Sequence, residues 1–292
     1  MKHFTILLLA LFIQSNVFAQ SIATPYPFDV QIKGKGKPII LIPGLACSGE
    51  VWNETVAELQ DQYECHVLTL AGFSTQKPIT LDSGFLPKIE RSIKTYIQKE
   101  LKEKPILIGH SLGGFLSMSL ASHDSALLEK IIIVDSYPFM AAAYNPNATE
   151  KNIVPQAQMM KRMILQTPDS TYAKQQKVTM GTMMRDPQKI ELSTQWAIAS
   201  SKETIGQAMY ELMTTDLRDE VAHISVPTLV LGNWFAGKDY GITKAMTQQN
   251  FESQFQKSTF VTIEIAEKAK HFIMWDEPNW FYDKVENFIA NE

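Results

Sequence analysis

Short runs of isoleucine, valine and leucine recur along this chain with amphipathic stretches between them, and this alternation restricts the possible folds more than any other feature. Continuous apolar runs of this length are typical of parallel strands that are buried on both faces. Strands are predicted at residues 38–42, 66–70, 105–108, 130–134, 227–231 and 259–265. Helices are predicted between them, at residues 50–60, 85–101, 111–123, 242–255 and 278–290. The pattern therefore predicts a doubly wound, mostly parallel α/β sheet.

Two segments depart from this rhythm. An earlier strand at 28–33 precedes the turn Gly34-Lys35-Gly36 and is expected to pair antiparallel at the sheet edge. The long interval after residue 134 holds no predicted strand before 227, which indicates an inserted helical cap at 137–225. The sheet domain would then consist of residues 20–136 and 226–292.

Methionines in the cap recur at helical spacing, which is typical of one helix face. They could line a pocket for a bulky apolar group, or they could pack the cap helices on one another. The sequence leaves both readings open. The spaced residues are Met159 with Met163, Met180 with Met183 and Met184, and Met209 with Met213.

The first residues have the composition of a targeting segment. Lys2 is followed by an apolar stretch and by the small-residue site Val17-Phe18-Ala19, a pattern that predicts a cleaved secretory signal peptide at 1–19. The mature protein would begin at Gln20 and be periplasmic or secreted. The apolar stretch is shorter than the roughly 18 residues of a membrane span, so no stable membrane insertion is expected.

Charge and cysteine content exclude several classes of protein. Lys and Arg number 27 against 31 Asp and Glu, a balance that does not favour nucleic acid as a partner. Cys47 follows the end of one predicted strand and Cys65 precedes the next, at opposite edges of a parallel sheet. That arrangement separates them by roughly 15 Å, beyond disulfide reach, so no internal disulfide is expected. Neither cysteine has partners at zinc-ligand spacing, so no metal site is predicted.

The segment IGHSLGG at 108–114 follows a predicted strand and opens a predicted helix. It is the G-x-S-x-G pattern of a nucleophile elbow, in which a sharp turn leaves no space for side chains flanking the serine. Ser111 is therefore the candidate nucleophile, with its hydroxyl at the carboxyl ends of the strands. The alternative is a glycine-rich packing turn.

A serine nucleophile needs a histidine base that is oriented by a carboxylate. His271 follows the last predicted strand and precedes the final helix, as such a base should. Asp239, after the 227–231 strand, is the preferred carboxylate, and Asp135, at the end of the 130–134 strand, is the rival. Asp216 suits a helix or loop cap instead.

Acyl transfer also needs N–H donors aimed at the developing oxyanion. The amide of Leu112, at the start of the helix after the serine, is one candidate. The amide of Leu45 is the other, because Gly44 lets the loop after the 38–42 strand approach closely.

Several segments together resemble the α/β-hydrolase superfamily, most closely its esterase-like branch with a helical cap. They are PGLACSG at 43–49, GHSLGG at 109–114, VDSYP at 134–138, VPTLVLGN at 226–233 and KHFIMWDEP at 270–278. The resemblance implies an eight-stranded core or nearly so, no cofactor, and a triad of Ser111, Asp239 and His271 under a lid. The chain departs from the superfamily in two places: Pro43-Gly44 replaces a common His-Gly, and Asp239 lies unusually far beyond Gly232.

The elbow narrows the expected chemistry. Dehalogenases and epoxide hydrolases of this fold need aspartate where Ser111 stands, and iminopeptidases usually have GGSWG where this chain has GHSLGG. The resemblance therefore implies a serine hydrolase for a small carboxylic ester or lactone with a bulky apolar group. Two alternatives remain: a ligand-binding protein that kept the fold with little turnover, and a hydrolase of amides or peptides.

Overall fold

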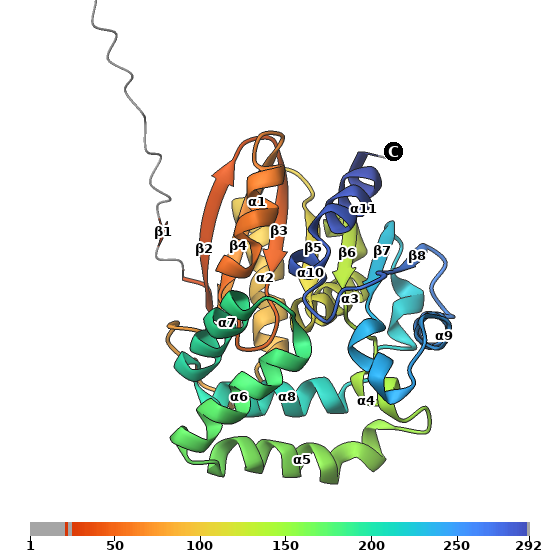
Figure 1. The fold of residues 1–292 in the computed structure, drawn as a ribbon. Coiled ribbons are helices and arrows are strands. Elements are labelled where there is room, and N and C mark those ends of the chain that lie inside the picture. Colours follow the sequence, from red (N-terminus) through yellow and green to blue (C-terminus); the bar gives the residue numbers. More distant parts are fainter. Residues whose placement is uncertain (1–20, 23–24, 291–292) are drawn as a thin grey trace, which may run out of the picture.

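The computed structural model describes residues 21–22 and 25–290, so the predicted signal peptide at 1–19 lies outside the described residues. An eight-stranded sheet in the order β1-β2-β4-β3-β5-β6-β7-β8 runs through the molecule (Figure 1). The strands are β1 (Ser21–Ile22), β2 (Phe28–Gly34), β3 (Lys37–Ile42), β4 (Tyr63–Leu70), β5 (Ile106–His110), β6 (Lys130–Val134), β7 (Thr228–Gly232) and β8 (Val261–Ile265). The predicted doubly wound, mostly parallel sheet is confirmed.

The antiparallel strands lie at one edge of this sheet. Strand β2 pairs with β4, although the glycine turn joins it in sequence to β3. Gly34 and Gly36 both have positive φ, and a Cβ at either position would lie within 2.4 Å of a backbone oxygen near the start of β4. The turn is therefore pressed against β4 and passes the chain across it to β3. The two-residue β1, which the sequence analysis did not predict, pairs outside β2.

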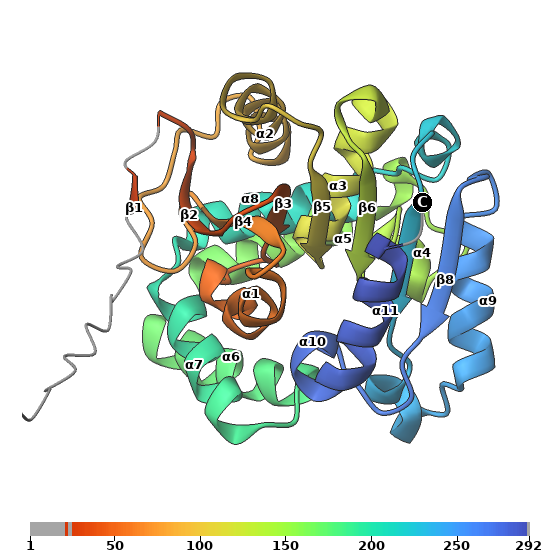
Figure 2. The same cartoon turned by 90° about the horizontal axis from the view of Figure 1, so that it is seen from above.

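Helices cover both faces of the sheet, and Figure 2 shows α1 and α11 on one side with α2 and α3 on the other. Buried residues of α2 recur at helical spacing, at Ile89, Ile93 and Ile97, as expected for a helix with one apolar face. The helical elements outside the insertion after β6 are η1 (Gly49–Trp52), α1 (Asn53–Leu59), α2 (Leu86–Glu100), α3 (Leu112–Asp124), η2 (Ser125–Leu127), η4 (Phe235–Tyr240), α9 (Lys244–Gln254), α10 (Ile273–Asp276) and α11 (Pro278–Ala290).

The insertion after β6 is helical and lies at the end of the sheet towards which β3 and β6 point (Figure 1). Helices α5 and α8 pack side by side, as do α6 and α7. Its elements are α4 (Met140–Tyr144), α5 (Glu150–Gln166), α6 (Asp169–Met183), α7 (Pro187–Ala199), α8 (Lys202–Thr214) and η3 (Glu220–His223).

The cap methionines do not share one environment. Met180, Met184 and Met213 are buried among other apolar side chains, which agrees with the packing interpretation. Met159 and Met163 on α5 are about half exposed, at 52% and 54%. These two side chains therefore lie at the surface of the cap and not in its core.

Both cysteines are buried and free. Cys65 pairs with Ile39 near the start of β3, whereas Cys47 lies beyond the end of that strand, as the sequence analysis expected. Burial raises the pKa of each thiol to about 12. The two residues are therefore apolar core groups, unreactive as thiolates. Within residues 25–290, no cluster of histidine, cysteine and acidic residues could hold a metal ion.

None of the helices in the described part of the chain combines the length and the apolar character that crossing a bilayer requires.

Candidate active site

Ser111 stands alone between the end of β5 and the start of α3, with φ of 53° and ψ of −116°. A positive φ is costly for a residue other than glycine and is tolerated where the surrounding structure enforces it. The neighbouring glycines allow the turn. A Cβ at Gly109 would lie 2.2 Å from the carbonyl oxygen of Gly113, and one at Gly113 would lie 2.2 Å from that of Ile42. Both positions therefore exclude any side chain, as the elbow pattern predicts.

The elbow is hydrogen-bonded to the end of the neighbouring strand β6, which Asp135 follows directly. His110 pairs with Val134 across β5 and β6, and the amide of Ser111 donates to the carbonyl oxygen of Val134 at 2.9 Å. The next residue on that strand is Asp135, whose own amide donates to Leu231 at 2.7 Å. Ser111 and Asp135 therefore follow neighbouring strands at the same level of the sheet.

His271 is bound to this carboxylate. Its Nδ1 donates to Oδ2 of Asp135 at 2.5 Å. Asn233 donates to the same carboxylate twice, from its backbone amide at 3.0 Å and from its side-chain amide at 2.5 Å. The Asp135 side chain is 7% exposed, and that of His271 is 22% exposed. A nearly buried carboxylate held by three donors fixes the orientation of the imidazole ring.

This geometry replaces Asp239 with Asp135 as the candidate acid. Asp239 lies in η4, is exposed, and makes no hydrogen bond to His271 among the contacts of residues 25–290. The reason is local: after β7 the chain uses Asn233 to bind Asp135 and then turns into η4, which carries Asp239 to the surface. The long spacing beyond Gly232 reflects this detour.

Nε2 of His271 makes no hydrogen bond within the described residues. The ring centroids of His110 and His271 are 4.5 Å apart, and Ser111 follows His110 directly in the chain. With Nδ1 engaged by Asp135, Nε2 is the atom that can take a proton. Ser111 Oγ makes no hydrogen bond to His271 within the described residues; such bonds are often long before substrate binds.

The loop after β3 lies against the elbow. A Cβ at Gly44 would be 3.2 Å from Cβ of Ser111 and 2.9 Å from Nδ1 of His110. Leu45 follows this contact and is half-buried, while Leu112 is the first residue of α3. In the described part of the chain neither the Leu45 nor the Leu112 amide donates to a protein acceptor. Both predicted oxyanion donors therefore come from segments that adjoin Ser111 and remain free.

Acidic residues of α10 and its end fasten the loop that carries His271. Glu277 Oε2 accepts from the amides of Lys268 at 2.6 Å and Ala269 at 2.7 Å. Asp276 Oδ2 accepts from the amide of Lys270 at 2.9 Å. The sequence analysis missed these roles and that of Asn233, although the acidic pair within KHFIMWDEP was a visible signal.

His110 is enclosed within the site. Its Nε2 donates to the carbonyl oxygen of His271 at 3.1 Å, while its Nδ1 is buried without a hydrogen-bond partner. Burial and the neighbouring His271 hold the pKa of His110 well below its usual range. The ring is therefore neutral when the protein is folded.

This burial predicts a loss of stability in acid. Below pH 6.5 the unfolded chain takes up a proton on His110 that the folded chain does not, so acid favours unfolding. Between pH 7.5 and pH 5.5 this linkage lowers the free energy of unfolding. Urea unfolding of the wild type and of His110→Gln at these two pH values measures the loss. The pH-dependent loss of unfolding free energy should be smaller in the variant.

Buried His66, whose pKa is also lowered by burial, keeps part of the pH dependence in the variant. An equal loss in His110→Gln and the wild type would contradict the neutral assignment.

Comparison with known proteins adds the family. The model of the alpha/beta hydrolase family matches residues 39–284. A pimeloyl-[acyl-carrier protein] methyl ester esterase from Aeromonas hydrophila is 28% identical over 268 residues, which cover 90% of this chain and 99% of that protein. The enzyme of the same name from Vibrio cholerae is 26% identical over 212 residues, 69% of this chain and 76% of that protein.

Solved structures share the fold at lower identity. A hydrolase from Pseudomonas aeruginosa superposes with a TM-score of 0.77 at 14% identity, over 94% of this chain and all of that one. An enol-lactonase from Burkholderia xenovorans gives a TM-score of 0.72 at 16% identity, over 90% of this chain and 96% of that one. The matched family model spans most of the sheet and the whole insertion, and the chain belongs to the alpha/beta hydrolase family.

Proposed function

We propose that this protein is a serine hydrolase that cleaves a carboxylic ester through an acyl-enzyme on Ser111, with His271 as base and Asp135 as orienting acid. The observation that carries the proposal is the His271–Asp135 hydrogen bond beside a strained, glycine-flanked serine. The curated relatives named as methyl ester esterases support the same reaction class.

The roles follow from the chemistry of the groups. Ser111 Oγ attacks the ester carbonyl carbon while Nε2 of His271 takes the hydroxyl proton. The amides of Leu45 and Leu112 stabilise the oxyanion of the tetrahedral intermediate. His271 then donates its proton to the leaving alkoxide, which departs as an alcohol. Water, deprotonated by His271, attacks the acyl-enzyme, releases the acid and restores the Ser111 hydroxyl.

Asp135 acts on this cycle through the histidine. Its contact with Nδ1 sets the tautomer that leaves Nε2 unprotonated in the resting enzyme, and its charge stabilises the imidazolium. Asn233 holds the carboxylate in place with its two hydrogen bonds. Each proton that moves in this cycle passes through His271, so the proposed reaction consumes only ester and water.

The substrate is proposed to be a small ester or lactone with an apolar group, taken up beneath the cap. Residues 1–19 are proposed to direct export, which would expose the enzyme to esters outside the cytoplasm. A protein that binds such compounds without turnover is the competing function, and it predicts saturable binding with no acid released.

A substrate panel tests this proposal. Purified protein should hydrolyse p-nitrophenyl esters of increasing acyl length, aliphatic methyl esters and lactones, and should leave the matching p-nitroanilides nearly untouched. Ser111→Ala, assayed in parallel, measures background hydrolysis. Faster cleavage of the anilides would replace the ester assignment with an amide one. Tight binding of the esters without turnover would favour the binding protein.

A further inference from the structure

The α6–α7 junction of the cap contacts the loop that carries His271. We call residues 181–185 the cap junction and residues 266–272 the histidine loop. The amide of Phe272 donates to the carbonyl oxygen of Met183 at 3.3 Å. The Nζ of Lys270 donates to the carbonyl oxygens of Gly181 at 2.9 Å and Met184 at 3.4 Å. The residues on both sides of His271 are thus bound to cap backbone.

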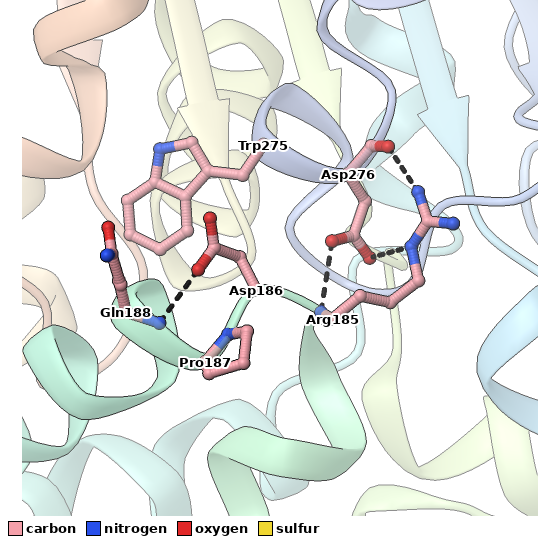
Figure 3. A pocket seen from close by; sticks show the side chains of 6 residues that line it. All are labelled: Arg185, Asp186, Pro187, Gln188, Trp275 and Asp276. Atoms are coloured by element: carbon pink, nitrogen blue, oxygen red, sulfur yellow. Dashed lines mark hydrogen bonds and ion pairs between the residues drawn. The ribbon is translucent and has the colours of Figure 1, made fainter.

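A second connection runs through Asp276, which Figure 3 shows bonded to Arg185. The Asp276 side chain is only 2% exposed. Its Oδ1 accepts from the amide of Arg185 at 3.1 Å, and its Oδ2 accepts from the amide of Lys270 at 2.9 Å. The Arg185 guanidinium folds back over the same residue: Nη2 donates to the Asp276 carbonyl oxygen, and Nε lies 3.6 Å from Oδ2. One carboxylate therefore joins the cap junction to the residue before His271.

The backbone of His271 itself is bound by a residue of the sheet domain. Nε2 of His110 donates to the carbonyl oxygen of His271 at 3.1 Å. Three consecutive residues, 270 to 272, thus each have one backbone group fixed, by Asp276, His110 and Met183 respectively. Of these three, the Met183 contact belongs to the cap, and the Asp276 contact is shared with it through Arg185.

We propose that the cap junction positions His271, so that the histidine is aligned only when the cap is packed against the histidine loop. This inference rests on the proposed function. A misplacement of about 1 Å at a reacting group can cost on the order of 10²-fold in rate, so a partial release of the loop has a measurable effect. Arg185 is therefore a positioning residue that acts through Asp276 and the loop.

Arg185→Met tests the proposal, because it removes the guanidinium contacts and keeps the backbone amide that binds Asp276. The assay compares p-nitrophenyl acetate, which has a small acyl group, with a bulky acyl ester. We expect kcat to fall roughly tenfold for both esters, with KM for the acetate changed less than about twofold. A loss confined to the bulky ester, or confined to KM, would show that the cap only lines the pocket.

The matched control is Lys177→Met. Lys177 on α6 pairs with Glu191 on α7 at 3.0 Å, with side chains 64% and 51% exposed, and among the hydrogen bonds and ion pairs of residues 25–290 neither side chain is bonded to the histidine loop. This variant loses an exposed ion pair between two cap helices and should keep kcat within about twofold for both esters. An equal loss in Lys177→Met and Arg185→Met would overturn a specific role for the junction.

Hydrogen exchange separates this proposal from the proposed function, because it needs no turnover. The amides of Lys270 and Phe272 should exchange roughly tenfold faster in Arg185→Met than in the wild type or Lys177→Met. Unchanged exchange would overturn the positioning role even in an active esterase. Faster exchange in a protein without any hydrolase activity would sustain the mechanical link and overturn the proposed function instead.

Asp276→Asn is the second variant, used if Arg185→Met does not fold. Asparagine replaces one of the two accepting oxygens with an NH₂ group, so the amide of Arg185 or that of Lys270 loses the oxygen that accepts from it. We expect the same kcat loss with an unchanged KM for the acetate. A folded Asp276→Asn with wild-type kcat and wild-type exchange at Lys270 would overturn the proposal.

Discussion

Ser111→Ala, His271→Ala and the double variant are expected to lose kcat by similar factors, roughly 10³ or more each. The reason is that the serine and the histidine act as one unit: without the base the hydroxyl is a poor nucleophile, and without the hydroxyl the base has no proton to take. The residual rate would come from the oxyanion donors and from substrate binding. The measurement is kcat for one p-nitrophenyl ester across the three proteins.

The matched control is His123→Ala. His123, near the end of α3, pairs with Glu90 of α2, and the His123 side chain is 52% exposed. It should retain activity within about twofold of the wild type, since such exposed pairs contribute little. Multiplication of the two single losses in the double variant would indicate independent effects and would contradict a shared mechanism.

The sheet could be predicted from sequence because its strands are buried on both faces. Strands β3, β5, β6 and β7 are almost wholly buried, and each apolar run lies within a few residues of the observed strand. Strand β1 has two residues and no apolar run of its own, so periodicity offers no signal for it. The cap was predictable as helical content, but not as an arrangement, because α5 and α8 each bury only part of their surface.

The candidate nucleophile could be found in the sequence for a different reason. The elbow is local: strand, glycine, serine and helix follow one another within a few residues, so a short stretch of sequence is enough to predict its geometry. The position of the candidate acid depends on which strand lies beside the elbow. That is a fact of sheet order, since β6 pairs with β5 and brings Asp135 level with Ser111.

The loop around His271 shows the same limit. Asp276 and Glu277 follow His271 closely in the chain, yet their function depends on α10 turning back to face the amides of residues 268–270. The partners in the cap lie far away in sequence, at residues 181–185. Contacts of that range leave no pattern in a single sequence. They become visible only once the insertion is folded over the strand ends.

The structure reverses the ranking of the two candidate acids, and this makes a second large effect testable. Asp135→Asn is expected to lower kcat on the order of 10³-fold or more, because an amide cannot hold His271 in the required tautomer or stabilise its imidazolium form. The backbone should tolerate the change: Asp135 has φ of 50°, and asparagine is among the residues that adopt such values most readily. A folded but inactive variant is therefore the expected result.

Asp239→Asn is the matched control, since it makes the same chemical change on an exposed carboxylate that the sequence analysis preferred as the acid. Its kcat should stay within about twofold of the wild type, as expected for a surface substitution away from the site. Both variants are compared with the wild type by thermal unfolding and by kcat for the same ester.

Asn233→Ala should give a kcat between those of Asp135→Asn and Asp239→Asn. The substitution removes the side-chain hydrogen bond to Asp135 and so loosens the carboxylate without removing its charge. Full activity in Asp135→Asn with a large loss in Asp239→Asn would mean that the loop after β7 rearranges during catalysis to bring Asp239 to His271.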